Sequence, residues 1–340
     1  MIQSLSTNQR EATLFFYCAN ITIESASSYA KVIKTGSYCE CYTFNVKGGG
    51  HVVEAIWVDQ QLKTYLNHGN LKVHSVYDHA LNLSNDLGMI TLVSQDKPKA
   101  PLTCVCDLQS FLNLQLNQGM TVQRYGHTLR MGSLSVDLSQ ASTVSLDHVI
   151  GCYPDLESIR LGHQSLAKWL IQHSRHDGAI RLFSTPHDVF SQHLVTLLKE
   201  YIRSHDIQLL PKLIGCGIGQ TPSGDDVLVG ILALAWSCYH LGFIQVLRHS
   251  CEPLLNQTTQ VSQMMLRQAF EGQFNEVHQD LILSLSRPHK VKEKADVCQR
   301  IGHTSGTDFM VGVALGYLVM AIVFVVMNYL KDPKEEQGTA

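Results

Sequence analysis

The chain has 340 residues, a formal net charge of −3 and 45% apolar residues, enough for two domains with a large core. Only 16% of the residues are charged and no basic stretch stands out, which argues against nucleic-acid binding. The ten cysteines lack C-x-x-C or zinc-type spacing, and the first residues lack the features of a signal peptide. We therefore expect reduced thiols and a cytoplasmic protein.

Residues 1–150 predict a β-rich domain. Short runs of β-branched and aromatic residues recur along this half, and clusters of Gly, Asn and Asp such as "KGGG" and "NHGN" separate them. The clearest runs are "CECYTFNV", "HVVEAIWV", "LKVHSVY", "GMITLVS", "PLTCVCDL" and "SLSVDL". Such regular spacing is typical of a sandwich or a barrel-like sheet.

Residues 151–331 predict a mostly α-helical domain, so the fold class is α+β, and residues 332–340 form a polar tail. In "STPHDVFSQHLVTLLKEYIRSHD", Thr185 can cap a helix and Pro186 fits its first turn. The expected apolar face of this helix is Val189, Phe190, Leu194, Leu197, Leu198 and Tyr201. We expect further helices from about Gly224 to Leu241 and within 258–285, and we interpret "SRPHKVKEKADVCQR" as a charged connection.

The segment from Phe309 to Leu330 is apolar and carries no charged residue. It is long enough to span a bilayer, and Gly312 and Gly316 form a G-x-x-x-G pattern. The alternative is a helix buried on all sides within the helical domain. We favour the buried helix, because the residues just before it belong to a motif that must lie inside the domain. A membrane association is therefore not expected.

One short motif occurs twice in the second half of the chain. Ser223 to Gly230 reads S-G-D-D-V-L-V-G, and Ser305 to Gly312 reads S-G-T-D-F-M-V-G. Both copies follow an Ile-Gly pair and a threonine, and both run into an apolar helix. This similarity predicts an internal correspondence between the two helix starts.

The residue types in the motif suit a site for a small anion. Serine, threonine and aspartate satisfy the free N–H groups of a first helical turn, and glycines let a ligand approach the backbone. Two converging helix N-termini would favour a phosphate or a carboxylate. A simple cap needs one oxygen, whereas the first copy offers Thr221, Ser223, Asp225 and Asp226. Adjacent carboxylates repel, so we expect one to cap the helix and the other to face a cation, a substrate N–H or a mobile proton.

Familiar nucleotide motifs fit this loop poorly. No Lys-Ser/Thr pair follows the glycines, as a P-loop requires, and "GCGIGQ" has the wrong spacing for a dinucleotide fingerprint. Cys216 is interpreted as structural. His303 stands two residues before Ser305, and the sequence leaves open whether it acts as an acid or base or merely packs.

At these residues the chain resembles the AllH-like family of oxamate carbamoyltransferase subunits. "GCGIGQTPSGDDVLVG" is similar to the family's G-x-G-x-G-x-T-P-S-G-D-D-x-x-x-G signature, and "IGHTSGTDFMVGV" to its G-H-[ST]-S-G-x-D signature. "TTQVSQMMLRQAFEGQFNEV" and, more weakly, "ALNLSNDLGMITL" resemble two further blocks. The departures are Ile218 where proline is common and Gln220 where leucine is common. The residues beyond about Met320 lie outside the resemblance.

The resemblance implies a role in allantoin degradation and purine nitrogen metabolism. The associated reaction converts oxalurate and phosphate to oxamate and carbamoyl phosphate, and it implies partner subunits. The catalytic candidates are Asp225, Asp226, His303 and Asp308. The candidates for binding substrate are Gly217, Gly219, Thr221, Ser223, Gly224, Thr304, Ser305, Gly306, Thr258 and Ser262.

We assign the candidates roles as hypotheses. The amides around Gly217, Gly219 and Gly224 would hold a phosphate or carboxylate. Asp225 or Asp226 would accept from the carbamoyl NH2 or hold a cation, for which Mg²⁺ is the candidate although no cofactor is certain. His303 would polarise the carbonyl or protonate the leaving nitrogen. The competing hypothesis is a non-catalytic component that binds the anion or scaffolds a complex.

Overall fold

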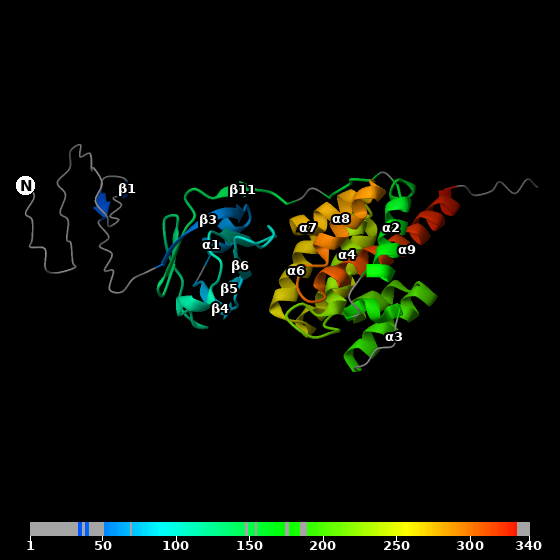
Figure 1. The fold of residues 1–340 in the computed structure, drawn as a ribbon, viewed down its shortest axis with the longest axis horizontal. Helices are drawn as coiled ribbons and strands as arrows, with labels where there is room; N and C mark the ends of the chain where they lie inside the picture. Colours follow the sequence, from blue (N-terminus) through cyan, green and yellow to red (C-terminus); the bar gives the residue numbers. More distant parts are fainter. Residues whose placement is uncertain are drawn as a thin grey trace, which may run out of the picture.

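The computed structural model describes residues 33–35, 38–40, 51–68, 70–146, 149–153, 155–173, 177–183 and 189–331. For residues 33–35, 38–40, 144, 183, 190, 191 and 322–331 it describes only the path of the backbone. A β region is followed along the chain by a helical region, and the two lie next to each other in space (Figure 1). The predicted α+β class is thereby confirmed, while the limits of the two domains stay a prediction.

The β region contains a separate hairpin and one large sheet. The hairpin pairs β1 (Ile33–Thr35) with β2 (Tyr38–Glu40). The sheet has the order β4-β5-β6-β7-β3-β10-β9-β8, and β11 also pairs with β3. Its elements are β3 (His51–Asp59), α1 (Leu62–Leu66), β4 (Lys72–Val76), β5 (Ala80–Asn85), β6 (Gly88–Ser94), β7 (Thr103–Cys106), η1 (Leu112–Leu114), β8 (Gln123–Tyr125), β9 (Thr128–Met131), β10 (Leu134–Asp137) and β11 (Ser142–Val144).

The two ends of this sheet approach each other, which makes it barrel-like. The Val73 N–H donates to the Met120 carbonyl at 2.8 Å, and the Val122 N–H donates to the Leu71 carbonyl at 2.9 Å. The segment leading into β8 therefore covers the free edge of β4 and removes an exposed sheet edge. Apolar side chains such as Leu92 and Phe111 fill the interior and are fully buried. Of the two predicted forms, a sandwich or a barrel-like sheet, the chain adopts the barrel-like sheet.

The helical region is built around α4, whose residues are almost all buried. Its closest neighbour is α9, which lies along it at the centre of the region (Figure 1). The elements are η2 (Glu157–Ile159), α2 (Arg160–His173), η3 (Gly178–Phe183), α3 (Val189–Ser204), η4 (Ile207–Leu213), α4 (Ser223–Ser237), α5 (Leu241–Cys251), η5 (Glu252–Gln257), α6 (Gln260–Phe270), α7 (Glu276–Ser284), α8 (Pro288–Cys298) and α9 (Ser305–Lys331).

Three local expectations need correction. The supposed charged connection forms α8, because Val291, Ala295 and Cys298 make a buried stripe at helical spacing beneath its charged face. The helix expected from about Gly224 to Leu241 is α4, which ends earlier than expected, at Ser237, and a separate helix, α5, starts at Leu241. Val189 is 76% exposed and lies outside the core.

Of the other residues expected on the apolar face of α3, four are buried and one has a side chain outside the described residues. Leu194, Leu197, Leu198 and Tyr201 are buried as predicted. The proposed cap Thr185, the following Pro186 and the side chain of Phe190 lie outside the described residues.

The apolar helix α9 packs inside the helical region along its described side chains. Phe309, Met310, Val313 and Met320 are fully buried, as expected for a central helix. Side chains from residue 322 onward lie outside the described part of the chain. Within that part, no helix combines the length and apolarity needed to cross a membrane.

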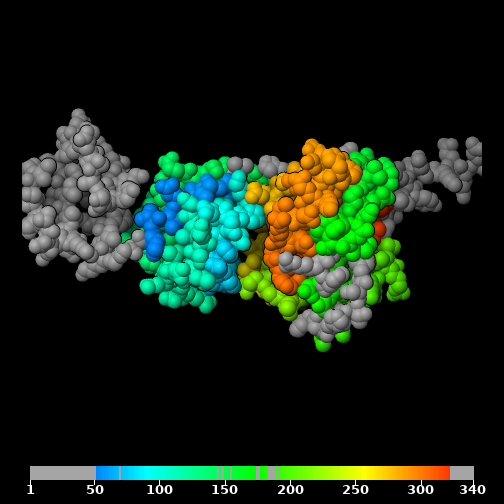
Figure 2. Space-filling view, viewed as in Figure 1, coloured from blue at the N-terminus to red at the C-terminus, as the bar shows by residue number. Residues whose placement is uncertain are grey.

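The β and helical regions are joined by direct contacts. Met264 of α6 packs into the core of the sheet. At α7, the Glu276 N–H donates to the Lys99 carbonyl and the Lys99 N–H donates to Glu276 Oε1, both at 2.9 Å. Figure 2 shows the cyan surface of the sheet against the yellow and orange helices. The two regions thus share a hydrogen-bonded boundary.

Candidate functional site

The two copies of the sequence motif meet where α4 and α9 pack together. A Cβ atom added to Gly230 would lie 2.1 Å from the Phe309 carbonyl oxygen, and one added to Gly312 would lie 2.1 Å from the Val227 carbonyl oxygen. Gly230 and Gly312 hold equivalent places in the repeat, as do Val227 and Phe309. The contacts are therefore reciprocal, and we infer that an approximate two-fold relation connects the two helix starts.

The first glycine of each copy serves the same close packing. A Cβ at Gly224 would meet the Leu213 carbonyl oxygen at 2.0 Å, and one at Gly306 would meet the Cys298 carbonyl oxygen at 1.8 Å. The Gly224 N–H donates to the Cys216 carbonyl at 2.8 Å. The Gly224 amide, for which we expected a role in anion binding, already has a partner.

A serine from one copy and a threonine from the other connect the motifs directly. Thr221 Oγ1 and Ser305 Oγ lie 2.8 Å apart and are hydrogen-bonded. Thr221, Thr304 and Ser305 are all half-buried, so their hydroxyls lie between the solvent and the deeper residues of each helix start. These three residues are called the hydroxyl rim below.

Asp225 braces the glycine loop against α6. Its Oδ1 accepts from the Gly215 N–H at 2.9 Å, and its Oδ2 accepts from Thr258 Oγ1 at 2.5 Å. Burial raises the pKa of Asp225, and hydrogen bonds from Thr258, Gly215 and Ser262 oppose that rise. The two weaker candidates from the third sequence block, Thr258 and Ser262, thus contact Asp225.

Asp226 and Asp308 occupy equivalent places in the two copies and are almost completely buried, at 2% and 0% exposure. The hydroxyls of Ser305 and Thr221 hydrogen-bond to Asp226, while those of Ser223 and Thr304 hydrogen-bond to Asp308. Each carboxylate therefore accepts a hydrogen bond from the serine of the other motif copy. Asp308 Oδ1 also accepts from the Ala179 N–H at 2.6 Å.

In each carboxylate, one oxygen has no hydrogen-bond partner among the described residues. Asp226 Oδ2 and Asp308 Oδ2 are buried and accept no well-formed hydrogen bond from any described residue. Burial raises the pKa of Asp226 well above 3.8, and the nearby charge of Asp308 adds to the rise. Burial raises the pKa of Asp308 to about 7, although its hydrogen bonds oppose this. The arrangement is a pair of costly buried acids rather than a pair of helix caps.

The helix start itself differs from the expected cap. Pro222 holds the capping position of α4 and offers no side-chain hydrogen bond, so Ser223, Asp225 and Asp226 lie in the first turn. Their side chains are therefore free to make the tertiary contacts described above. The simple capping interpretation of this first copy is wrong, because its oxygens bond to other segments.

The glycine loop before α4 is exposed at residues 218–220, whereas Gly217 packs against the start of the helix, 2.5 Å from the Ser223 N for an added Cβ. Gly217 and Gly219 have φ angles of 133° and 97°, which favour glycine, and no atom lies within 4 Å of a Cβ added at Gly219. Ile218 is 77% exposed. This part of the loop retains the freedom to approach a ligand.

His303 and Cys216 differ from the carboxylates. His303 is exposed, and the structure gives its ring no hydrogen-bond or ion-pair partner among the described residues. The Cys216 thiol donates to the Lys212 carbonyl at 3.2 Å, and burial raises its pKa, which opposes thiolate formation. Cys216 thus has the surroundings of a structural thiol, whereas the role of His303 stays a prediction.

One part of the site had little signal in the sequence. The Ala179 N–H that donates to Asp308 belongs to η3, which is distant from both motifs in the sequence. Gly178 precedes it with a φ angle of 76°, and a Cβ there would lie 2.3 Å from Asp308 Oδ1. A glycine at this position is the only sequence feature that marks the contact. Within the described residues, no three His, Cys, Asp or Glu side chains form a metal-binding cluster.

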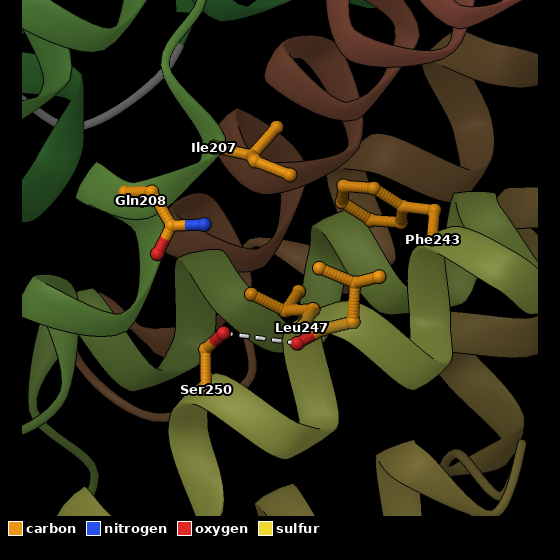
Figure 3. A pocket seen from close by; sticks show the side chains of 6 residues that line it. Ile207, Gln208, Phe243, Leu247 and Ser250 are labelled. Carbon is orange, nitrogen blue, oxygen red and sulfur yellow. Dashed lines mark hydrogen bonds between the residues drawn. The ribbon is translucent and has the colours of Figure 1, made fainter.

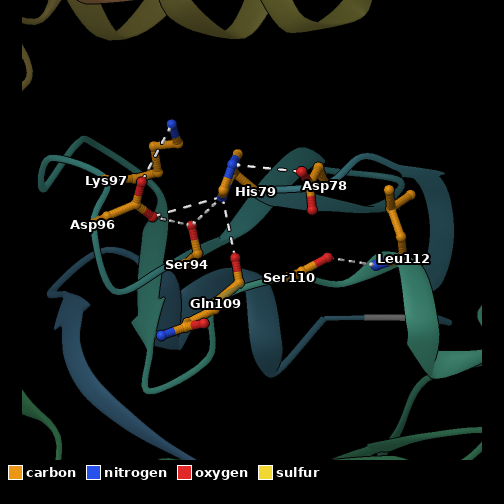
Figure 4. A network of polar contacts seen from close by, with 8 residues as sticks. All are labelled: Asp78, His79, Ser94, Asp96, Lys97, Gln109, Ser110 and Leu112. Atoms are coloured by element: carbon orange, nitrogen blue, oxygen red, sulfur yellow. Dashed lines mark hydrogen bonds and ion pairs between the residues drawn. The ribbon is translucent and has the colours of Figure 1, made fainter.

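Two pockets lie away from the motifs. The first is a small apolar one between η4 and α5, lined by residues such as Phe243 and Leu247 (Figure 3). The second has a volume of about 420 Å³ and is lined by Tyr77, Val93 and Lys97 among others. At its edge His79 Nδ1 contacts Ser94 Oγ and the Gln109 carbonyl, both at 3.1 Å (Figure 4). These contacts fix the imidazole in the β region.

Comparison with known protein families decides where the chain belongs. Residues 213–317 match the family model described as oxamate carbamoyltransferase subunit AllH, and residues 54–143 match the AllH family N-terminal domain. The chain belongs to the AllH family. The AllH match spans both motif copies, and the N-terminal match lies within the barrel-like sheet. No solved structure matches the chain.

Proposed function

We propose that this AllH-family chain binds the small anionic substrate of an oxamate carbamoyltransferase at the paired starts of α4 and α9. The observation that carries the proposal is the hydrogen bond between Thr221 and Ser305, which joins the two family motifs. Residues far apart in sequence thereby form one rim of hydroxyl donors above two buried carboxylates. Hydroxyls and helix N-termini are suitable partners for carboxylate and phosphate oxygens.

The reaction proposed is the transfer of a carbamoyl group between oxalurate and phosphate. A phosphate oxygen attacks the carbamoyl carbon, the carbon–nitrogen bond to oxamate breaks, and the leaving nitrogen takes up a proton. The hydroxyl rim, the open backbone at Gly219 and the neighbouring amide of Gly217 would hold the anionic groups. Asp226 and Asp308 would orient the carbamoyl nitrogen or hold a cation, and His303 remains the candidate proton donor for the leaving nitrogen.

A thermal-shift titration of the full chain tests this proposal. Carbamoyl phosphate, phosphate, oxamate and oxalurate are each added with and without Mg²⁺, because a ligand of the folded state raises the melting temperature. We expect at least one to raise it in the wild type and to do so much less in Asp226→Asn. The matched control is Asp280→Asn, since Asp280 is an exposed partner of Lys294. A full response in Asp226→Asn would remove Asp226 from the site.

A second candidate is a non-catalytic subunit, and one observation favours it. The hydroxyl rim is closed by its own hydrogen bond, and the carboxylates beneath it are shielded from solvent. Binding would then need a partner subunit that opens the rim or supplies the rest of the site. If none of the four ligands changes the melting temperature of the isolated chain, this candidate is preferred. Activity recovered only on adding the other subunits would support it further.

A further inference from the structure

We propose that Asp226 and Asp308 together hold one Mg²⁺ ion where α4 and α9 meet, beneath the hydroxyl rim. The ion would join the two copies of the motif and offer its remaining coordination positions to an incoming anion. The second half of this inference rests on the proposed function, whereas the ion site itself does not. The ligand class is a small, hard divalent cation that prefers oxygen donors.

The first argument is the pair of carboxylate oxygens without partners. Asp226 Oδ2 and Asp308 Oδ2 are buried, and no described residue donates a hydrogen bond to either. Their companion contacts come from hydroxyls and one backbone amide, so no described residue accounts for the second oxygen of each group. An ionised oxygen left unpaired in a protein interior costs several kcal/mol, and a bound cation removes that cost.

The second argument is the charge of the surroundings. Asp225 on the same helix turn adds negative charge near Asp226, and Asp177 lies near Asp308 but is ion-paired with Arg181 at 2.5 Å. Among the described residues, no salt bridge joins either Asp226 or Asp308 to a lysine or arginine. Within the part of the chain that the structure describes, Asp226 and Asp308 are therefore buried negative groups with no direct ion pair of their own.

The donor set also explains why the first motif copy has two aspartates. Asp225 uses both oxygens on Gly215 and Thr258, so it braces the loop and does not face the ion. Only one carboxylate of each copy remains, which agrees with the absence of a three-residue metal cluster among the described residues. Mg²⁺ is commonly bound by one or two carboxylates, with water and substrate oxygens completing its coordination.

The ion would resolve a conflict within the proposed function. An oxalurate or phosphate anion placed against two bare carboxylates would be repelled, and helix N-termini offset only a small part of that repulsion. A divalent cation between them reverses the sign of the field that the anion meets. Substrate binding would then depend on Mg²⁺, and the hydrogen bond between Thr221 and Ser305 would open as the anion reaches the ion.

Manganese binding to the full chain provides the test. Mn²⁺ is titrated into the metal-free protein while its free concentration is followed by electron paramagnetic resonance, and Mg²⁺ is then added as competitor. We expect one Mn²⁺ per chain, displaced by Mg²⁺. Asp226→Asn and Asp308→Asn should each weaken binding about tenfold or more, because each removes a charged ligand. Asp280→Asn, the same change at an exposed aspartate, should leave the affinity unchanged.

Each result has a defined meaning. Failure of the wild type to bind Mn²⁺, or unchanged binding in both folded variants, overturns the ion site, and the buried pair would then hold protons instead. Circular dichroism identifies any variant that does not fold, and Ser305→Ala, which keeps both carboxylates, is expected to bind the ion. Ion binding without any oxalurate response keeps this inference and defeats the proposed function. If oxalurate raises the melting temperature equally with and without metal, the proposed function is kept and the ion site is overturned.

Discussion

Asp225 and Asp226 are adjacent in the sequence, yet they have different tasks because they point to different segments. Asp225 bonds to Gly215 of the loop and to Thr258 just before α6, whereas Asp226 faces the start of α9. Successive residues of a helix differ by about 100° in direction, so one turn can serve two neighbours. At this scale the chemistry depends on which donors surround each side chain.

The bracing role of Asp225 predicts the effect of Thr258→Val. The change removes the hydroxyl that donates to Asp225 Oδ2 and leaves a buried carboxylate with one donor fewer. Hydrogen bonds to charged groups contribute about 1.5–3 kcal/mol, so we expect the free energy of unfolding to fall by that amount in urea titrations. Thr196→Val is the control, because Thr196 is exposed and bonds only within its own helix. Equal losses in both variants would contradict the brace.

The burial of His278 leads us to expect that the free energy of unfolding depends on pH. Its ring is buried and stacks on Phe309 at a centroid distance of 3.6 Å, and burial lowers its pKa from 6.5 to about 3. Between these values the unfolded chain binds a proton that the folded chain excludes. The unfolding free energy should therefore fall as pH drops below 6.5, by about 1.4 kcal/mol per pH unit from this group.

The measurement compares urea unfolding at pH 7.5, 6 and 5 in the wild type, His278→Gln and His289→Gln. We expect His278→Gln to lose this part of the acid dependence. His289 is exposed, so its variant should retain the wild-type slope. Parallel slopes in all three proteins would show that His278 is not the responsible group.

At the scale of the elements, the site depends on how closely α4 and α9 approach. Small residues at equivalent places let the backbone of each helix contact the other, and this brings the two motif copies together. The hydroxyl bond between Thr221 and Ser305 follows from that approach. The helix contact is thus the element-scale condition for the whole site.

Gly230→Ala tests this contact. The new methyl group would lie 2.1 Å from the Phe309 carbonyl oxygen, which forces the helices apart. Overpacking of this kind costs about 1–3 kcal/mol or more, which urea unfolding would measure. Gly242→Ala in α5 is the control because nothing lies within 4 Å of its added Cβ, and it should be neutral or slightly stabilising. A neutral Gly230→Ala variant would contradict the close approach.

At the scale of the whole molecule, the barrel-like sheet and the helical region are held together through α6 and α7. The paired hydrogen bonds between Lys99 and Glu276, and the Gln279 side chain that donates to the Leu146 carbonyl, connect residues distant in sequence. These hydrogen bonds tie the sheet to the helices that follow the candidate site in the chain.

Glu276→Ala is expected to loosen this boundary. The Lys99 N–H loses its acceptor, Glu276 Oε1, so its protection from hydrogen exchange should fall by about tenfold or more. Residues of α4 should retain their protection, because they lie in the core of the helical region. The control Glu293→Ala removes only a surface pair with Lys290. An unchanged exchange rate at Lys99 in Glu276→Ala would show that the boundary is held by other contacts.

Local patterns determined much of the architecture. The predicted runs between residues 51 and 137 became strands of the sheet, because alternating apolar residues suit a half-buried strand wherever it is paired, whereas most of "CECYTFNV" lies outside the described residues. The repeated Ser-Gly-x-Asp motif and the all-apolar segment after it indicated two related helices, one of them central. These features depend on residues close together in the chain, so the sequence expresses them directly.

Only the tertiary structure decided the closure of the barrel, the separate tasks of Asp225 and Asp226, and the contact of Ala179 with Asp308. It also placed His303 at the surface, although it is close in sequence to Ser305. Each of these depends on segments brought together from distant parts of the chain, and the free energy of such contacts depends on burial and geometry that no local pattern encodes. The sequence by itself named the residue types of the site, and packing decided which of them meet.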